Sequence, residues 1–372
     1  MMTSLVRLTS SLKLLGATSQ RRMHDSCRTD ETQLAILRMF IGGMLFAVIP
    51  VVPYGWLDTV PAEFFHPVPG LPQLIHHLPF QIPLTYLDWI IRGLCLALAL
   101  GIRSRITGTL LGMSLLYGNC FRYSIGKIDH DDILLIITIV SLSWEGRWGR
   151  KLALLPDSSR YSAGTWAPSV IALCISAGMF TAGFEKMISW IDWDLSTSGF
   201  ISWYRYKQNL QSLTFIGRRL ALLPAWVHEG LDYLTVIFEM TPLLCLLLSR
   251  RIWKCWLIAA TIFHLSIYLV LQINFFNQCL TYLTFTCWIF YQSRGQVFLN
   301  RSDAKFMIVA AAGICAVAIT RMILIRIWGF IPGLPVICLA VVLLIQLRGY
   351  WLEWRTMSGP GGQVLGTQEC GV

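Results

Sequence analysis

One long apolar stretch, residues 168–194, constrains the fold more than any other part of the sequence; it reads PSVIALCISAGMFTAGFEKMISWIDWD. About 20 apolar residues, each rising 1.5 Å along a helix, are enough to cross the hydrocarbon core of a bilayer. The stretch therefore predicts a transmembrane helix, and it carries Glu185 and Lys186 near its far end. A charged amine at that position needs a physical reason, because charges within membranes are costly.

Small side chains precede Lys186 on one face of this predicted helix. Gly178, Ala182 and Lys186 are spaced four residues apart, so they predict a stripe along which a neighbouring helix approaches closely. Burial against that neighbour disfavours the charged form of an amine, which is how a lysine becomes a general base near neutral pH. Two simpler interpretations stay open: Lys186 extends to the membrane interface, or it pairs with Glu185.

The composition assigns the whole chain to the polytopic membrane proteins. Of its 372 residues 55% are hydrophobic and 13% are charged, and the mean hydropathy is +0.59. We therefore predict an all-α fold, a membrane bundle of about ten transmembrane helices. The net charge of +10 is spread over short basic clusters between apolar runs, which indicates membrane topology rather than nucleic-acid binding. The 11 cysteines lie mostly within apolar runs, as core residues do, and predict neither disulfides nor a metal site.

The apolar runs divide the chain into a basic cytosolic tail at 1–33, one transmembrane domain at 34–347, and a short flexible tail at 348–372. The basic, Ser/Thr-rich start also resembles a mitochondrial targeting segment, and the membrane that holds the protein stays open. The predicted spans are 34–52, 88–101, 106–120, 130–144, 168–194, 230–248, 252–273, 275–291, 306–325 and 330–347. With both termini cytosolic, 19 Lys and Arg residues fall in cytosolic segments and 8 in outer segments, as the positive-inside rule expects.

Two outer loops follow from this topology. The loop at 54–87 contains prolines and histidines but neither Lys nor Arg, which favours the non-cytosolic side. The connection at 189–229 is rich in Trp and Tyr, which predicts a segment lying on the membrane surface. The same topology brings two ionisable residues, His130 and Lys186, to the outer membrane face.

Four residues are candidates for chemistry or for ligand binding within this frame. His130 opens the fourth span beside acidic residues, which favour a protonated and oriented imidazole; the alternative is a solvated helix start. Glu239 and His264 each lie inside a predicted span and should face protein or a cavity. Their alternative role is a structural hydrogen bond between helices. The Lys186 amine is the candidate general base, with His130 as its partner.

Several short motifs resemble the HTTM proteins, the membrane domains related to vitamin K-dependent gamma-carboxylase. They are DHDDILL at 129–135, AGFEK at 182–186, Asp192 with Trp193, FEMTP at 238–242 and FHLSIYL at 263–269. The resemblance covers most of residues 34–291. In the carboxylase, the lysine of the AG-x-x-K segment deprotonates reduced vitamin K at the lumenal face, and a histidine opening the earlier span assists.

The resemblance implies catalytic roles for Lys186 and His130. It also implies a substrate-binding set, formed by Glu185, Glu239, His264 and Trp193, and a reduced quinone such as vitamin K as the small molecule. Two differences limit it: the carboxylase continues into a large lumenal region that this chain lacks, and it carries a basic residue where this chain has Glu185. Gamma-carboxylation of a protein is therefore not implied.

Two hypotheses about function remain. The first is a membrane-embedded enzyme that acts on a quinone-like or other lipid substrate at the non-cytosolic face, with Lys186 as general base. The second is a non-catalytic membrane protein that binds a lipid or assists the maturation or export of another protein. An elongated cavity that reaches Lys186 would favour the first, and a filled helix interface there would favour the second. Membrane lipids are the expected partners in both cases.

Overall fold

The computed structural model describes residues 17–29, 31–48, 54–78, 82–126, 130–157, 166–192, 194, 197–209, 214–286 and 334–358. Within these ranges the chain is helical throughout, and the one β feature is an isolated bridge between Ile102 and Leu155. The predicted all-α fold is therefore confirmed for the described part of the chain.

Apart from a helix at 17–26 in the basic start of the chain, each helix corresponds to an apolar run of the sequence or to one of the two loops at 54–87 and 189–229. In chain order the elements are a helix at 17–26, α2 (Glu31–Val48), η2 (Tyr54–Thr59), η3 (Ala62–Phe64), α3 (Leu71–His76), α4 (Leu84–Ala99), α5 (Ser104–Tyr123), α6 (His130–Glu145), α7 (Trp166–Trp190), α8 (Gly199–Asn209), α9 (Phe215–Leu220), α10 (Ala225–Met240), α11 (Pro242–Leu248), α12 (Arg250–Leu271), α13 (Phe276–Tyr282), η4 (Leu283–Phe285) and α15 (Leu334–Ser358).

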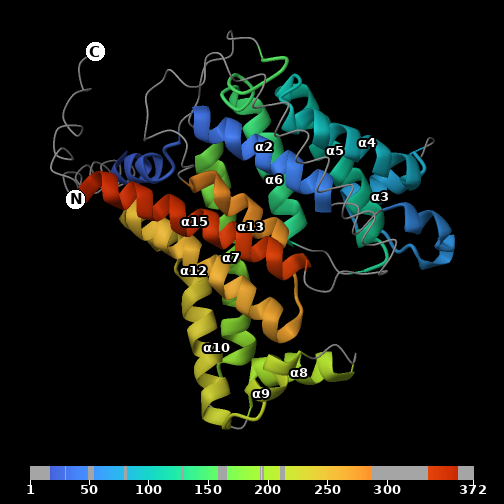
Figure 1. Cartoon of the computed structure of the whole chain (residues 1–372). Coiled ribbons are helices and arrows are strands. Elements are labelled where there is room, and N and C mark those ends of the chain that lie inside the picture. The colour runs from blue at the N-terminus through green and yellow to red at the C-terminus, as the bar shows by residue number, and fades with distance from the viewer. Residues whose placement is uncertain are drawn as a thin grey trace, which may run out of the picture.

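Helix α7 joins two groups of helices. Before it, α2, α4, α5 and α6 pack in chain order, each against the next, and α6 packs against α7. After it, α10 and α11 both pack on α7, and α12 packs against α11 and α15 (Figure 1). The short helices α8 and α9 lie at the end of the molecule away from α2 to α6. The central stretch of the sequence is thus also the central helix of the fold.

The sixth predicted span, 230–248, is a broken helix. Helix α10 ends at Met240, α11 begins at Pro242, and the two are bent by 48°. Proline lacks a backbone N–H and its ring clashes with the preceding turn, so Pro242 accounts for the break. The bend leaves Glu239 in the last turn of α10 instead of mid-helix, where the sequence pattern had placed it.

Two described helices are long and apolar enough to cross a membrane, α7 and α12. The count rises to three if the bent pair α10 and α11 forms one span, and α15 contains a shorter apolar helix over Val336–Trp351. The predicted spans 34–52, 88–101, 106–120 and 130–144 are helices of 16 to 20 residues, and none of these four is among the helices long and apolar enough to cross a membrane. The ninth predicted span, 306–325, lies outside the described residues.

At both ends, packed residues extend beyond the predicted domain boundaries at 33 and 347. Helix α15 continues to Ser358, because Glu353 forms ion pairs with Arg250, 3.1 Å away, and with Lys254. At the other end, Ser26 donates a hydrogen bond to the carbonyl of Leu246 at 2.9 Å. Residues assigned to the tails by their polarity are therefore partly packed against the bundle.

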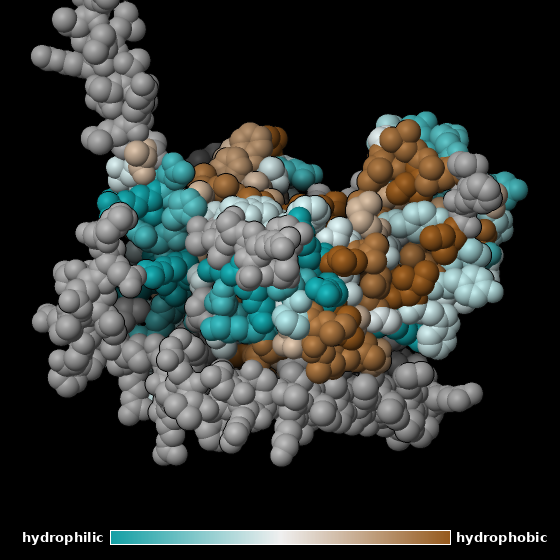
Figure 2. Space-filling model, turned by 90° about the horizontal axis from the view of Figure 1, so that it is seen from above, coloured by the Kyte–Doolittle hydropathy of each residue, from teal (hydrophilic) through white to brown (hydrophobic). Residues whose placement is uncertain are grey.

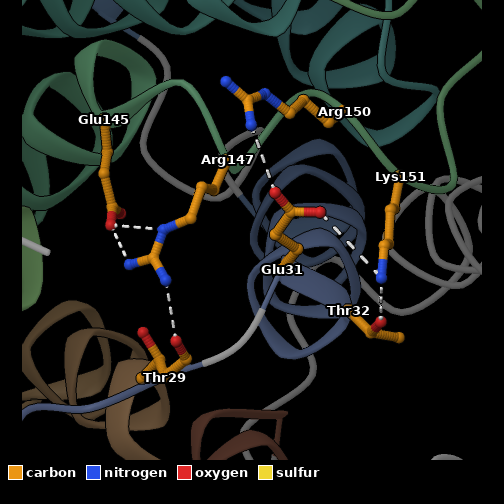
Figure 3. Close-up of polar contacts among 7 residues, drawn as sticks. All are labelled: Thr29, Glu31, Thr32, Glu145, Arg147, Arg150 and Lys151. Carbon is orange, nitrogen blue, oxygen red and sulfur yellow. Dashed lines mark hydrogen bonds and ion pairs between the residues drawn. The ribbon is translucent and has the colours of Figure 1, made fainter. Parts of the chain in front are cut away.

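The basic loop after α6 is held against the start of α2. Arg147 donates to the carboxylate of Glu145 and, at 2.9 Å, to the carbonyl of Thr29, while Arg150 pairs with Glu31 at 3.3 Å (Figure 3). These contacts connect the end of α6 and the loop after it to the start of α2 and the residues just before it, and Glu145 and Arg147 are buried. A loop that the sequence marks as a topology signal is thereby also a structural connection.

A buried arginine of α2 supports the same loop from inside. The Arg38 guanidinium, fully buried, donates to the carbonyls of Trp148 at 2.7 Å and Lys151 at 3.2 Å, and to that of Leu152. Backbone carbonyls carry no formal charge, so these bonds occupy donors on Nη1 and Nη2 without neutralising the cation, and Nε has no hydrogen-bond partner within the described residues. Leu152 also has a positive φ of 49°, which fits a loop shaped around the guanidinium.

The close approach of a second helix to α7 occurs at Gly183 and not along the predicted Gly178 stripe. A Cβ at Gly183 would lie 2.9 Å from the Cβ of Glu239 and 3.1 Å from the Cγ of Met240. Gly178 is exposed, and a Cβ there would have no neighbour within 4 Å among the described residues. The prediction of a stripe through Gly178 and Ala182 was wrong because small residues occupy more than one face of α7, and only packing selects between the faces.

We expect alanine to have opposite effects at these two glycines. Gly178→Ala should raise the free energy of unfolding by up to about 1 kcal/mol, since alanine is the better helix former in an open position. Gly183→Ala should lower it, because the methyl group forces α7 and α10 apart. Unfolding of the two variants in mixed micelles measures both effects, and equal stabilisation by the two substitutions would contradict this packing.

Candidate functional site

Lys186 and Glu239 form an ion pair between α7 and α10. The Lys186 Nζ donates to both carboxylate oxygens of Glu239, at 2.6 Å to Oε2 and at a shorter distance to Oε1. The two side chains differ in access: 24% of the Lys186 side chain is exposed, against 4% for Glu239. A molecule that approaches this pair from outside therefore meets the amine before the carboxylate.

The local sequence positions the pair. Gly183 lies one turn before Lys186 and lets the backbone of α10 come close enough for Glu239 to reach the amine. The ring of Trp190, one turn later, has its centroid 5.3 Å from the Lys186 Nζ, which adds a cation–π contact. Glu185 is exposed, since adjacent helical residues point about 100° apart. Lys186 thus pairs with Glu239 from another helix and not with Glu185.

A second polar group is buried where α12 and α13 meet α7. Nε2 of His264 lies 3.0 Å from the hydroxyl of Tyr282, and Gln278 donates from Nε2 to that hydroxyl at 2.8 Å. The Gln278 amide also lies 3.3 Å from the Sδ of Met179 on α7. The hydroxyl accepts from Gln278, and we assign its own proton to the hydrogen bond with His264 Nε2; in the other tautomer Nε2–H donates to the hydroxyl. With this assignment the proton of a neutral imidazole is on Nδ1.

The imidazole is enclosed by aromatic rings, and its second nitrogen is unsatisfied. The ring of Phe275 has its centroid 4.6 Å from that of His264. His264 Nδ1 is buried and has no hydrogen-bond partner within the described part of the chain. An unpaired buried ring nitrogen is unusual, and in the tautomer assigned above it is a donor for a bound molecule. Electrostatic interactions connect the two groups, Lys186 with His264 and Glu239 with Tyr282.

Two of the residues predicted for the site have side chains outside the described part of the structure. His130 is the first residue of α6, but its side chain is not described, and Trp193 lies outside the described residues. Asp132, two residues after His130 in α6, accepts a hydrogen bond from Asn277 of α13 at 2.6 Å and pairs with Arg122 at 2.8 Å. The start of α6 is therefore bound to the helix that carries Gln278 and Tyr282. The proximity of His130 to Lys186 stays a prediction.

Sequence reasoning missed the polar residues of α13. Asn277, Gln278 and Tyr282 lie in the run INFFNQCLTYL, which the hydropathy pattern presents as part of an ordinary span. Two consecutive amides inside an apolar run are the signal that was available, because buried amides need partners. Their partners, Asp132 and the Tyr282 hydroxyl, lie at positions that no local spacing rule predicts.

The arrangement is suited to binding or proton transfer more than to metal chemistry. Among the described residues, His, Cys, Asp and Glu side chains do not gather in a group of three or more that would hold a metal ion.

Comparisons of this chain with protein-family models, with curated proteins and with solved structures found no match. The function is therefore argued from the geometry of the pair and of the His264 group.

We expect the Lys186–Glu239 pair to be strongly coupled in stability. Lys186→Met or Glu239→Gln alone should cost about 2–3 kcal/mol, below the range for fully buried pairs, because the amine is partly exposed. The double variant should cost less than the sum of the two single variants, since neither charge is left unpaired. Unfolding in mixed micelles gives the four free energies. Glu185→Gln is the matched control, and additive losses would contradict the coupling.

Proposed function

We propose that this chain is an integral membrane protein built from about ten transmembrane helices, and a relative of the HTTM proteins. The large apolar side chains on the outside of its long helices support this. They include Leu173, Phe180, Phe184 and Ile188 of α7, Ile252 and Ile262 of α12, and Ile337, Val341, Leu344 and Leu347 of α15. Figure 2 shows hydrophobic side chains gathered on the surface beside hydrophilic ones. A bilayer covers such surfaces without the cost that water imposes.

The proposed topology places both termini and the 145–165 loop in the cytosol and the 54–87 and 189–229 loops outside. Two observations support this topology. The sequence has a bias of Lys and Arg toward the proposed cytosolic segments. The basic loop also packs against the start of α2, so these two segments lie on the same side of the bundle. A small tag inserted at residue 155 should be inaccessible to a membrane-impermeant label in sealed, right-side-out vesicles. Labelling of that tag from the outer side would overturn the topology.

Within this frame we propose that the protein is an enzyme that deprotonates a lipid-soluble, quinol-like substrate, with Lys186 as general base. The observation that carries the proposal is the difference in solvent exposure within the pair: the amine is partly exposed while its partner carboxylate is buried. The resemblance of AGFEK at 182–186 to the carboxylase segment supports the same role. His130 is the proposed assisting residue, and a reduced quinone is the proposed small molecule.

The pair offers a route for the proton. In low dielectric, burial disfavours both charges of an ion pair, so the proton of Lys186 can pass along the hydrogen bond to Glu239. The neutral amine then accepts the proton of the substrate hydroxyl as that O–H bond breaks. The substrate anion is left beside the ammonium, and the net charge of the site does not change. His264 Nδ1–H is available to orient a carbonyl or a second hydroxyl.

Oxidation of phylloquinol in air tests this proposal, because the deprotonated hydroquinone loses electrons to oxygen faster than the neutral form. The purified full chain in micelles should accelerate loss of the hydroquinone absorbance about 100-fold over a protein-free control, the usual gain from general base catalysis. Lys186→Arg should return the rate to background, since a guanidinium stays protonated. Glu185→Gln, on the exposed neighbour, should retain the rate. A wild-type rate at background would exclude a quinol of this kind as substrate.

A second candidate function is binding without catalysis, as expected of a lipid-binding or maturation-assisting membrane protein. The tight packing of Gly183 against Glu239 favours it, because that packing fills the helix interface beside Lys186. In this case Lys186 is a fixed positive charge. Full activity of Lys186→Arg in the phylloquinol assay, or in a complementation assay, would support this function over the enzyme.

A further inference from the structure

A groove lies between α12, α15 and the end of α13, and neither Lys186 nor Glu239 lines it. It holds about 250 Å³ of space, partly open to the outside, and its lining consists of Lys254, Leu257, Ile258, Tyr282, Phe285, Thr286, Gln346 and Tyr350. A second hollow of about 230 Å³ shares Lys254 and Tyr350 with it. The two are therefore one continuous groove along α12 and α15.

The inner part of the groove contains a buried amide without a partner. Gln346 is 4% exposed, and neither its Oε1 nor its Nε2 has a hydrogen-bond partner within the described part of the chain. Leaving such a group unsatisfied costs about 1–3 kcal/mol, so a buried amide of this kind is usually bonded to something. Tyr282 and Thr286 lie beside it, while Leu257, Ile258 and Phe285 give apolar walls. This end is suited to an ester or hydroxyl oxygen on an apolar chain.

The outer part of the groove is basic and aromatic. Arg251, Lys254 and Glu353 line this part, and Glu353 pairs with Lys254 and, at 3.1 Å, with Arg250. Two of the three charged residues in this lining are therefore cationic. Trp354, which lines this part, is 54% exposed, as is typical of tryptophans at the level of lipid headgroups. This end is suited to an anionic headgroup.

The two ends are separated by a distance that fits a lipid. Glu353 is seven residues beyond Gln346 on α15, which corresponds to about 10 Å along a helix. We propose that the groove binds an anionic phospholipid, with its phosphate at Arg251 and Lys254 and a glycerol-ester oxygen at the Gln346 amide. The acyl chain would lie on Leu257 and Ile258. The inference rests on the proposed membrane location but not on any chemistry at Lys186.

Native mass spectrometry of the purified full chain with dioleoyl phosphatidylglycerol tests the site. We expect this lipid to bind at least tenfold more tightly than dioleoyl phosphatidylcholine, and Arg251→Gln to lose most of that difference. Arg205→Gln, which removes an exposed arginine of α8 at the other end of the molecule, is the matched control and should have no effect. Equal binding of the two lipids, or an equal loss with Arg205→Gln, would overturn the proposal.

Gln346→Leu gives a second test, which distinguishes a lipid-binding role of the amide from a purely structural role. The substitution removes an unsatisfied polar group from a buried position, so the lipid-free protein should unfold at the same or a higher temperature. Stabilisation by phosphatidylglycerol should nevertheless be reduced several-fold. Inorganic phosphate that competes with the lipid would assign the groove to free phosphate instead. Gln346→Leu should still oxidise phylloquinol, because Gln346 is not part of the Lys186 site. Lipid binding and phylloquinol oxidation therefore test the groove and the proposed function separately.

Discussion

The ion pair between Lys186 and Glu239 is the interaction on which the rest of this structure depends. It joins α7, which contacts the helices before and after it, to α10, whose end is fixed by the break at Pro242. Gly183 makes the pairing possible because it lets the two backbones approach. Two opposite charges at an apolar interface stabilise each other only if both are present.

Much of the fold could be predicted from hydrophobic runs. The stretch at 168–194 corresponds to α7 at Trp166–Trp190, and 252–273 corresponds to α12 at Arg250–Leu271. Packing faces could not be predicted in the same way, because α7 is apolar on every side. Gly178 and Gly183 are five residues apart and point about 140° apart on a helix. Only Gly183 faces α10, and the sequence contains no local sign of that choice.

The candidate site could be predicted in its residues but not in its connections. Lys186, Glu239 and His264 stand out in the sequence as polar groups within apolar runs. Their partners depend on how separate helices rotate toward one another: Lys186 meets Glu239 across 53 positions, and His264 meets Tyr282 across 18. Hydropathy likewise missed the end of α15, because Glu353 looks like a tail residue until its pairs with Arg250 and Lys254 are known.

The protonation of Glu239 tests the account most directly, because the proposed proton transfer requires the carboxylate to become a carboxylic acid. Infrared difference spectra of the full chain, recorded before and after addition of phylloquinol under anaerobic conditions, report this change. We predict a new carboxylic-acid carbonyl band on binding that is absent from Glu239→Gln. Binding of phylloquinol with no such band in the wild-type protein would contradict the account and leave Lys186 as a fixed charge.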